Sequence, residues 1–194
     1  PTTPAPPAPV PAPSPGPAGT TCGAWPGSGS VTLFSATDRP AEPASTDGAK
    51  YSLGLRVRSS VDGTIRAVRY LKAAGEVAAA RTVTVFDWVS AVQYVGFKGS
   101  ADSFCAGGQW VSLALPTPLK AVAGKEYLIS VDGFTVISKT DSFFPRTTGP
   151  LTGTGSSSGL TGYVPWDVYW EKTNYFLDGK WGGGGGRFDD APCL

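Results

Sequence analysis

The first nineteen residues are rich in proline, and this composition restricts the folds that they can adopt. Residues 1–19 read PTTPAPPAPVPAPSPGPAG and hold nine of the eighteen prolines in the chain. Proline fixes φ and has no amide hydrogen, so this segment can form neither a helix nor a central strand. The sequence therefore predicts an extended polyproline II arm with a rise of about 3.1 Å per residue.

Two uses suit such an arm. The alternation of Pro with Ala, Ser and Thr resembles the hydroxyproline-rich, O-glycosylated segments of algal and plant wall proteins, and Thr2, Thr3 and Ser14 are the candidate glycosylation sites. A semi-rigid linker is the commoner use of proline-rich segments. If the arm docks on another copy, its contact residues are the prolines at its centre, namely Pro4, Pro6, Pro7, Pro9, Pro11, Pro13 and Pro15.

Composition argues against several classes of protein. Only 16% of residues are charged and the net charge is +1, whereas nucleic-acid binding needs a basic face. No apolar run reaches the roughly 18 residues that span a bilayer. We therefore expect no nucleic-acid partner and no membrane insertion. The chain starts with Pro1 instead of Met, which we interpret as a mature secreted form or a piece of a longer chain, located outside the cell or on its surface.

Three cysteines, Cys22, Cys105 and Cys193, allow three intramolecular pairings. None is spaced as CxxC and the chain has no His, which argues against a zinc site. Cys22 follows the proline-rich segment and Cys193 is the penultimate residue, so these two bracket the globular part. A disulfide that closes a domain at its ends suits an oxidising compartment, and Cys22–Cys193 is the pairing that we favour. Cys105 is then a buried thiol, a free thiol or a bridge to another chain.

From Cys22 onward, short apolar runs alternate with Gly, Pro, Ser and Asp at the spacing of many short strands. The clearest period of two is in residues 51–60, with Leu53, Leu55 and Val57 on one face. The other predicted strands are 31–36, 65–73, 80–89, 134–139, 173–181 and two strands around a proline-punctuated connection in 109–133. This pattern predicts an all-β fold, a two-sheet antiparallel β-sandwich of jelly-roll-like type.

Five consecutive glycines at 182–186 mark the end of the predicted sandwich. A glycine run is flexible and lets the residues after it change direction. We therefore divide the chain into an arm at 1–21, a β-sandwich domain at 22–181, and a Gly-rich swivel with a C-terminal tail at 182–194.

Four blocks of the chain follow one another in order, namely YSLGLRVRSSVDGTIRAVRYLKA at 51–73 and the blocks at 107–133, 149–163 and 173–181. Together they resemble the bacterial family called domain of unknown function 4082, and the first block is similar to its opening strands. The loop at 89–108 is longer than the family pattern, Ser52 stands where the family has an acidic residue, and its usual His is missing. The resemblance implies a β-sandwich found beside sugar-binding and adhesive modules on secreted proteins, with no established reaction.

Catalytic and metal-binding chemistry has weak support in the sequence. A glycosidase needs two facing carboxylates, for which the candidates are Asp132, Asp141, Asp167, Glu171 and Asp178. Carboxylates on loops are ordinary, and a Ser-His-Asp triad is impossible without His. We expect no enzyme and no cofactor. Calcium prefers carboxylate and carbonyl oxygens, but no spacing singles out the polar-loop candidates Asp38, Asp47 and Asp102.

An aromatic cluster, Tyr163, Trp166, Tyr169 and Trp170, follows a Gly/Ser-rich stretch. Flat aromatic faces stack on sugar rings or on prolines, so these residues are a candidate stacking surface, and packing in the core is the other interpretation.

Two functional hypotheses follow. In the first, the chain is a structural subunit that assembles head-to-tail into a fibril or surface layer, with the arm of one copy in an aromatic-lined groove of the next. In the alternative, it is a carbohydrate-binding or adhesive module on a Pro-rich linker, and Trp166 and Trp170 hold a glycan.

Overall fold

We describe a computed structural model of the chain at residues 20–22, 30–34, 38–103, 105–140, 144–160 and 177–183, where the regular structure consists of strands. The strands in these residues are β1 (Thr20–Cys22), β2 (Ser30–Val31), β3 (Glu42–Ser45), β4 (Tyr51–Ser59), β5 (Gly63–Leu71), β6 (Ala80–Asp87), β7 (Gln93–Ala101), β8 (Trp110–Ala121), β9 (Glu126–Phe134), β10 (Ile137–Lys139), β11 (Arg146–Thr148), β12 (Leu151–Leu160) and β13 (Leu177–Gly183).

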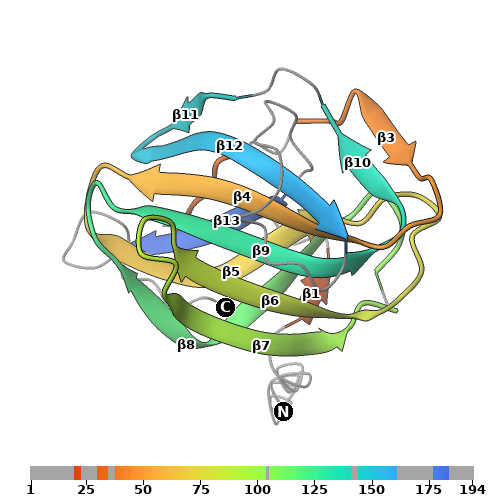
Figure 1. Cartoon of the computed structure of the whole chain (residues 1–194), viewed down its shortest axis with the longest axis horizontal. Helices are drawn as coiled ribbons and strands as arrows, with labels where there is room; N and C mark the ends of the chain where they lie inside the picture. Colours follow the sequence, from red (N-terminus) through yellow and green to blue (C-terminus); the bar gives the residue numbers. More distant parts are fainter. Residues whose placement is uncertain are drawn as a thin grey trace, which may run out of the picture.

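Two sheets form the layers of a sandwich (Figure 1). One has the order β1-β8-β5-β13-β2 and the other β11-β12-β4-β9-β6-β7, while β10 and β3 form a small separate sheet. All pairings between the described strands are antiparallel. The chain crosses between the two large sheets after β4, β5, β7, β8 and β12. The predicted all-β, two-sheet antiparallel sandwich is confirmed.

The core lies between the two large sheets and follows the period of two. Leu53, Leu55 and Val57 of β4 are at most 2% exposed, whereas Arg58 on the opposite face of the same strand is exposed. Burying each such aliphatic side chain contributes about 1.5–3 kcal/mol. Other strands of both large sheets add further fully buried side chains, among them Ile65, Val68, Val83, Val85, Val111, Ile129 and Val131.

The prolines in residues 109–133 lie inside a strand, which corrects the prediction that they punctuate a connection. Pro116 and Pro118 belong to β8, and the turn to β9 falls at residues 122–125. The register between β5 and β8 shifts next to Arg66, where β8 has extra residues. Such a bulge tolerates proline because it needs fewer ladder amides than a regular pairing.

Two strands lie where the sequence predicts loops. β7 occupies much of the 89–108 loop, and β12 lies within the Gly/Ser-rich stretch 149–163. Gly153 of β12 lies so close to the core that a Cβ there would be 2.5 Å from Leu33 Cδ2 and 2.6 Å from Phe144 Cε1. Gly153 thus lets β12 approach the core closely, although a Gly/Ser-rich sequence is typical of a loop.

Three boundaries differ from the predicted ones. β1 begins at Thr20, within the predicted arm, and β13 continues to Gly183, beyond the predicted end of the sandwich. The strand predicted at 31–36 is described at residues 31–34, of which Val31 belongs to a ladder, where β2 pairs with β13. Leu33 and Phe34 are buried in the core just after the end of β2.

Candidate functional site

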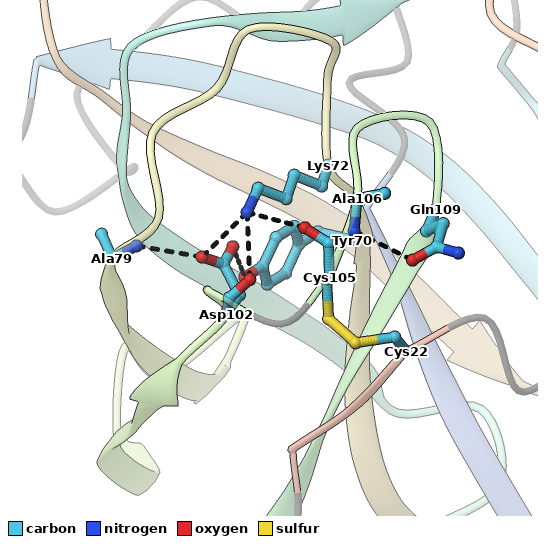
Figure 2. The surroundings of a disulfide bond; sticks show 8 residues. All are labelled: Cys22, Tyr70, Lys72, Ala79, Asp102, Cys105, Ala106 and Gln109. Atoms are coloured by element: carbon cyan, nitrogen blue, oxygen red, sulfur yellow. Dashed lines mark hydrogen bonds and ion pairs between the residues drawn. A yellow bond between two sulfur atoms is a disulfide. The ribbon is translucent and has the colours of Figure 1, made fainter.

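A disulfide fixes the point at which the chain enters the sandwich (Figure 2). Cys22 is the last residue of β1, and it is bonded to Cys105 in the β7–β8 connection, with Cα atoms 5.4 Å apart. The predicted Cys22–Cys193 pairing is therefore wrong, and Cys193 lies outside the described residues. The reason is the register of β1, which places Cys22 opposite Val111 of β8, a few residues after Cys105.

A buried ammonium group organises the turn that carries Cys105. Lys72 Nζ donates hydrogen bonds to the backbone carbonyls of Asp102 and Cys105, both at 3.0 Å, and to Asp102 Oδ1 at 3.3 Å. Lys72 is 5% exposed and Asp102 is 0% exposed. An ion pair at this depth is tolerated only when its remaining hydrogen-bonding capacity is also satisfied.

The remaining bonds to Asp102 meet that condition. Its Oδ2 accepts a hydrogen bond from the Tyr70 hydroxyl at 2.6 Å, and its Oδ1 accepts one from the Ala79 amide at 2.9 Å. Burial, followed by the hydrogen bond to Asp102, raises the pKa of Tyr70 well above its ordinary value. Tyr70 therefore keeps its proton and donates a hydrogen bond to Asp102. We call Cys22, Cys105, Tyr70, Lys72 and Asp102 the arm junction.

Sequence reasoning did not find this network. Tyr70 and Lys72 were assigned only to a strand, and Asp102 only to the group of loop acids that could bind calcium. In the sequence, a lysine at the end of a predicted strand cannot be distinguished from an ordinary exposed lysine. Its burial depends on the 102–105 turn folding back over β5, a long-range contact without a local signal in the sequence.

The other described acids of the catalytic and calcium sets are engaged in separate interactions. Asp38 forms a bidentate pair with Arg146, at 3.0 and 2.7 Å. Asp47 accepts hydrogen bonds from the Tyr51 hydroxyl and the Ala49 amide, and the Tyr51 hydroxyl is the main cause of its lowered pKa.

Asp132 accepts a hydrogen bond from the Ser52 hydroxyl at 2.6 Å. Asp178 is placed only by its backbone in β13. No group of three or more His, Cys, Asp or Glu side chains that could hold a metal ion occurs in the described residues. That part of the chain also has no helix that is long and apolar enough to cross a membrane.

Many of the predicted site residues lie outside the described part of the chain. They are the arm prolines (Pro4, Pro6, Pro7, Pro9, Pro11, Pro13 and Pro15), the glycosylation candidates Thr2, Thr3 and Ser14, the aromatic residues Tyr163, Trp166, Tyr169 and Trp170, and the acids Asp141, Asp167 and Glu171.

Comparison with known protein families matches residues 37–177 to a domain of unknown function, DUF4082. The chain belongs to this family. No curated protein matches it. The DUF4082 match includes Cys105 but excludes Cys22, β1 and the proline-rich residues before them. The disulfide therefore ties a segment that precedes the DUF4082 match to the DUF4082 domain itself.

Proposed function

We propose that the chain is a non-enzymatic extracellular structural subunit that assembles head-to-tail into a fibril or surface layer through its Pro-rich arm. The partners of each subunit are other copies of the chain, and O-linked glycans on Thr2, Thr3 and Ser14 decorate the arm. The DUF4082 sandwich is the body of the subunit, and the arm is its connector.

The observation that carries this proposal is the disulfide between Cys22 and Cys105 at the base of the arm. An arm that connects subunits transmits tension to the sandwich at the residue where it enters. That entry strand, β1, pairs with β8 over three residues only. A typical backbone hydrogen bond contributes about 0.5–1.5 kcal/mol. A ladder this short therefore separates under modest force. The disulfide gives the arm a covalent attachment to the β7–β8 connection.

The buried part of the arm junction supports the same interpretation. Lys72 binds the carbonyls at both ends of the 102–105 turn, so it holds Cys105 in place. Asp102 also links this turn to β5 through Tyr70, and to the residue before β6 through the Ala79 amide. Tension on Cys22 is thereby shared by β5 and β6, which belong to different sheets. A passive linker has no need of such an anchor.

The proposed location outside the cell is consistent with the same bond. Disulfides persist in oxidising compartments and are rare in the cytosol. The arm and the sparse surface charge suit close packing of copies, since few charges would have to be desolvated.

Comparison of the full chain with residues 20–194 tests this proposal. Light scattering and negative-stain electron microscopy should show large, regular assemblies of the full chain and only small species without the arm. Thermal unfolding of the shortened chain checks that the sandwich is intact. Equal assembly of the two chains would reject the proposal. Glycan binding by a chain that stays monomeric would favour the carbohydrate-binding alternative.

A further inference from the structure

One end of the sandwich carries most of the exposed large apolar side chains of the described residues. Val89 is 85% exposed, Val92 52%, Tyr94 38% and Val122 54%, and the fifth such side chain, Val77, lies elsewhere. Val89 and Val92 belong to the β6–β7 connection, Tyr94 is the second residue of β7, and Val122 belongs to the β8–β9 turn. We call these four residues the tip surface.

The two connections that form the tip surface are bound to each other (Figure 1 shows them at the same end of the sandwich). The Trp88 amide donates to the Glu126 carbonyl at 3.0 Å, and Lys125 Nζ pairs with Asp87 Oδ2 at 2.7 Å. Lys125 Nζ also lies 5.1 Å from the centre of the Tyr94 ring. The four apolar side chains therefore lie on connected segments at one end of the sandwich.

The β6–β7 connection holds its valines outward in a fixed conformation. Asp87 Oδ1 accepts hydrogen bonds from the amides of Val89 and Ser90, both at 2.9 Å, and the Asp87 amide donates to the Val92 carbonyl at 2.8 Å. Ala91 has a φ of 59°, a conformation that favours Gly or Asn. A hairpin connection normally uses Gly, Asn or Asp, so exposed valines and a left-handed alanine are an unexpected choice for a solvated turn.

Size and charge restrict what can cover this surface. Four side chains offer on the order of a few hundred Å², whereas a stable interface between globular partners needs about 800 Å² on each side. A thin, extended apolar segment fits better. The nearby charges of Asp87 and Lys125 are already paired with each other, so the occupant needs no charge of its own.

The Pro-rich arm has these properties. Residues 1–19 contain no Asp, Glu, Lys or Arg. Polyproline II segments bind to apolar and aromatic surfaces at low cost in conformational entropy. At about 3.1 Å per residue, nineteen residues extend roughly 59 Å, which is enough to cross from one copy to a neighbour.

We propose that the tip surface receives the Pro-rich arm of a neighbouring copy. This inference rests on the proposed function and identifies the acceptor surface for its assembly contact. The arm enters β1 opposite Leu113, eight residues before the end of β8, or at most about 26 Å from the tip. The reach of the arm thus also allows contact with its own tip, and the experiment has to separate the two cases.

Photo-cross-linking of the full chain tests the proposal. A photo-reactive phenylalanine analogue replaces Val10 in the arm, and nitrogen-15-labelled copies are mixed with unlabelled copies before irradiation. Mass spectrometry then identifies which peptides are joined and whether they come from different copies. We expect mixed-isotope cross-links to peptides that contain residues 88–94 or 122.

The variant Val89→Ser with Val92→Ser should lower these inter-copy cross-links about ten-fold, because two apolar contacts are lost. Both residues are exposed, and an unchanged melting temperature verifies folding. The matched control is Val77→Ser, which removes an exposed valine (61%) outside the tip surface and should leave the cross-links unchanged.

Three results would overturn the inference. Inter-copy cross-links to another surface, with assembly intact, would leave the proposed function standing and remove the tip surface from it. Cross-links within single copies only would show that the arm covers its own tip. An equal loss of inter-copy cross-links for Val77→Ser would show that removing any exposed valine has this effect, whether or not it belongs to the tip surface. Failure of the proposed function is a separate result, namely assembly that persists without the arm.

Discussion

At the residue scale, the buried ammonium of Lys72 is the centre of the arm junction. Its three acceptors are two carbonyls and the Asp102 carboxylate. Removing one partner of a buried ion pair leaves the other charge uncompensated, at a cost of about 3–5 kcal/mol. The variant Lys72→Met should therefore lower the free energy of unfolding by about that amount, measured by guanidinium titration with tryptophan fluorescence.

Lys139→Met is the matched control for Lys72→Met. Lys139 pairs with Glu42 at 3.2 Å, but the two side chains are 30% and 47% exposed. Exposed pairs contribute about 0–1 kcal/mol. Similar losses for the two variants would mean that the Lys72 network does not hold the 102–105 turn.

The Asp87 carboxylate at the tip predicts a dependence of stability on pH. The Lys125 ammonium, followed by the Ser90 amide, lowers the pKa of Asp87 below its ordinary value. The unfolded chain therefore takes up a proton more readily than the folded one, so Asp87 stabilises the fold above about pH 4. This contribution is lost as the pH falls through the lower, folded-state pKa.

Asp87→Asn removes this contribution. The variant should be less stable than the wild type near neutral pH, and its denaturation midpoint should fall less between pH 6 and pH 3. Urea titrations across that range measure both quantities. If the denaturation midpoints of wild type and variant fall by the same amount between pH 6 and pH 3, the pair with Lys125 has no part in the acid sensitivity of the fold.

At the scale of single elements, β12 depends on the absence of side chains. The variant Gly153→Ala places a methyl group 2.5 Å from Leu33 Cδ2 and 2.6 Å from Phe144 Cε1, and both neighbours are buried. Overpacking of this kind costs about 1–3 kcal/mol. Thermal unfolding should show a lower melting temperature for the variant.

Gly96→Ala in β7 is the control for Gly153→Ala. A Cβ at Gly96 meets Gln93 Nε2, the far end of an exposed side chain that can move away. The expected change is small, within about 0.5 kcal/mol. An equal loss for Gly96→Ala would point to a general intolerance of strand glycines to substitution.

The same elements show what could be predicted from the sequence. Alternation in β4 predicts its buried face, because Leu53, Leu55 and Val57 have strong apolar character and a period of two. β12 has no such pattern, and its Gly153 lies where Leu33 and Phe144 leave no space for a Cβ. The bulge of β8 is equally invisible locally, because it depends on the register against β5.

The site was harder to predict than the fold. Spacing along the chain favoured Cys193 as the partner of Cys22, because these two bracket the domain. The choice between Cys105 and Cys193 depends on where β1 adds to the five-stranded sheet. That is a contact between residues about ninety positions apart, and no local signal specifies it.

At the scale of the whole molecule, the Cys22–Cys105 bond closes a large loop, with a sequence separation of 83. Cross-linking a loop of this length restricts the unfolded chain and stabilises the fold by about 4 kcal/mol. The double variant Cys22→Ala with Cys105→Ala should lose about this much, measured by guanidinium titration under oxidising conditions. Cys193→Ala keeps the bond and serves as the control. A larger loss for Cys193→Ala would contradict the pairing.

The anchored arm and the sandwich together define the proposed subunit. The DUF4082 match covers the body of the sandwich, and the disulfide joins it to a segment outside the match. Tension applied through the arm therefore enters a domain with two sheets and a continuous apolar core. This arrangement is what a connector between subunits requires.

Sedimentation velocity tests the role of the arm most directly. The full chain is compared with a chain of equal length in which Pro4, Pro6, Pro7, Pro9, Pro11, Pro13 and Pro15 are replaced by serine. We predict large species that grow with concentration for the native arm, and a monomer at every concentration for the serine arm. The same distribution of species for both chains would contradict it.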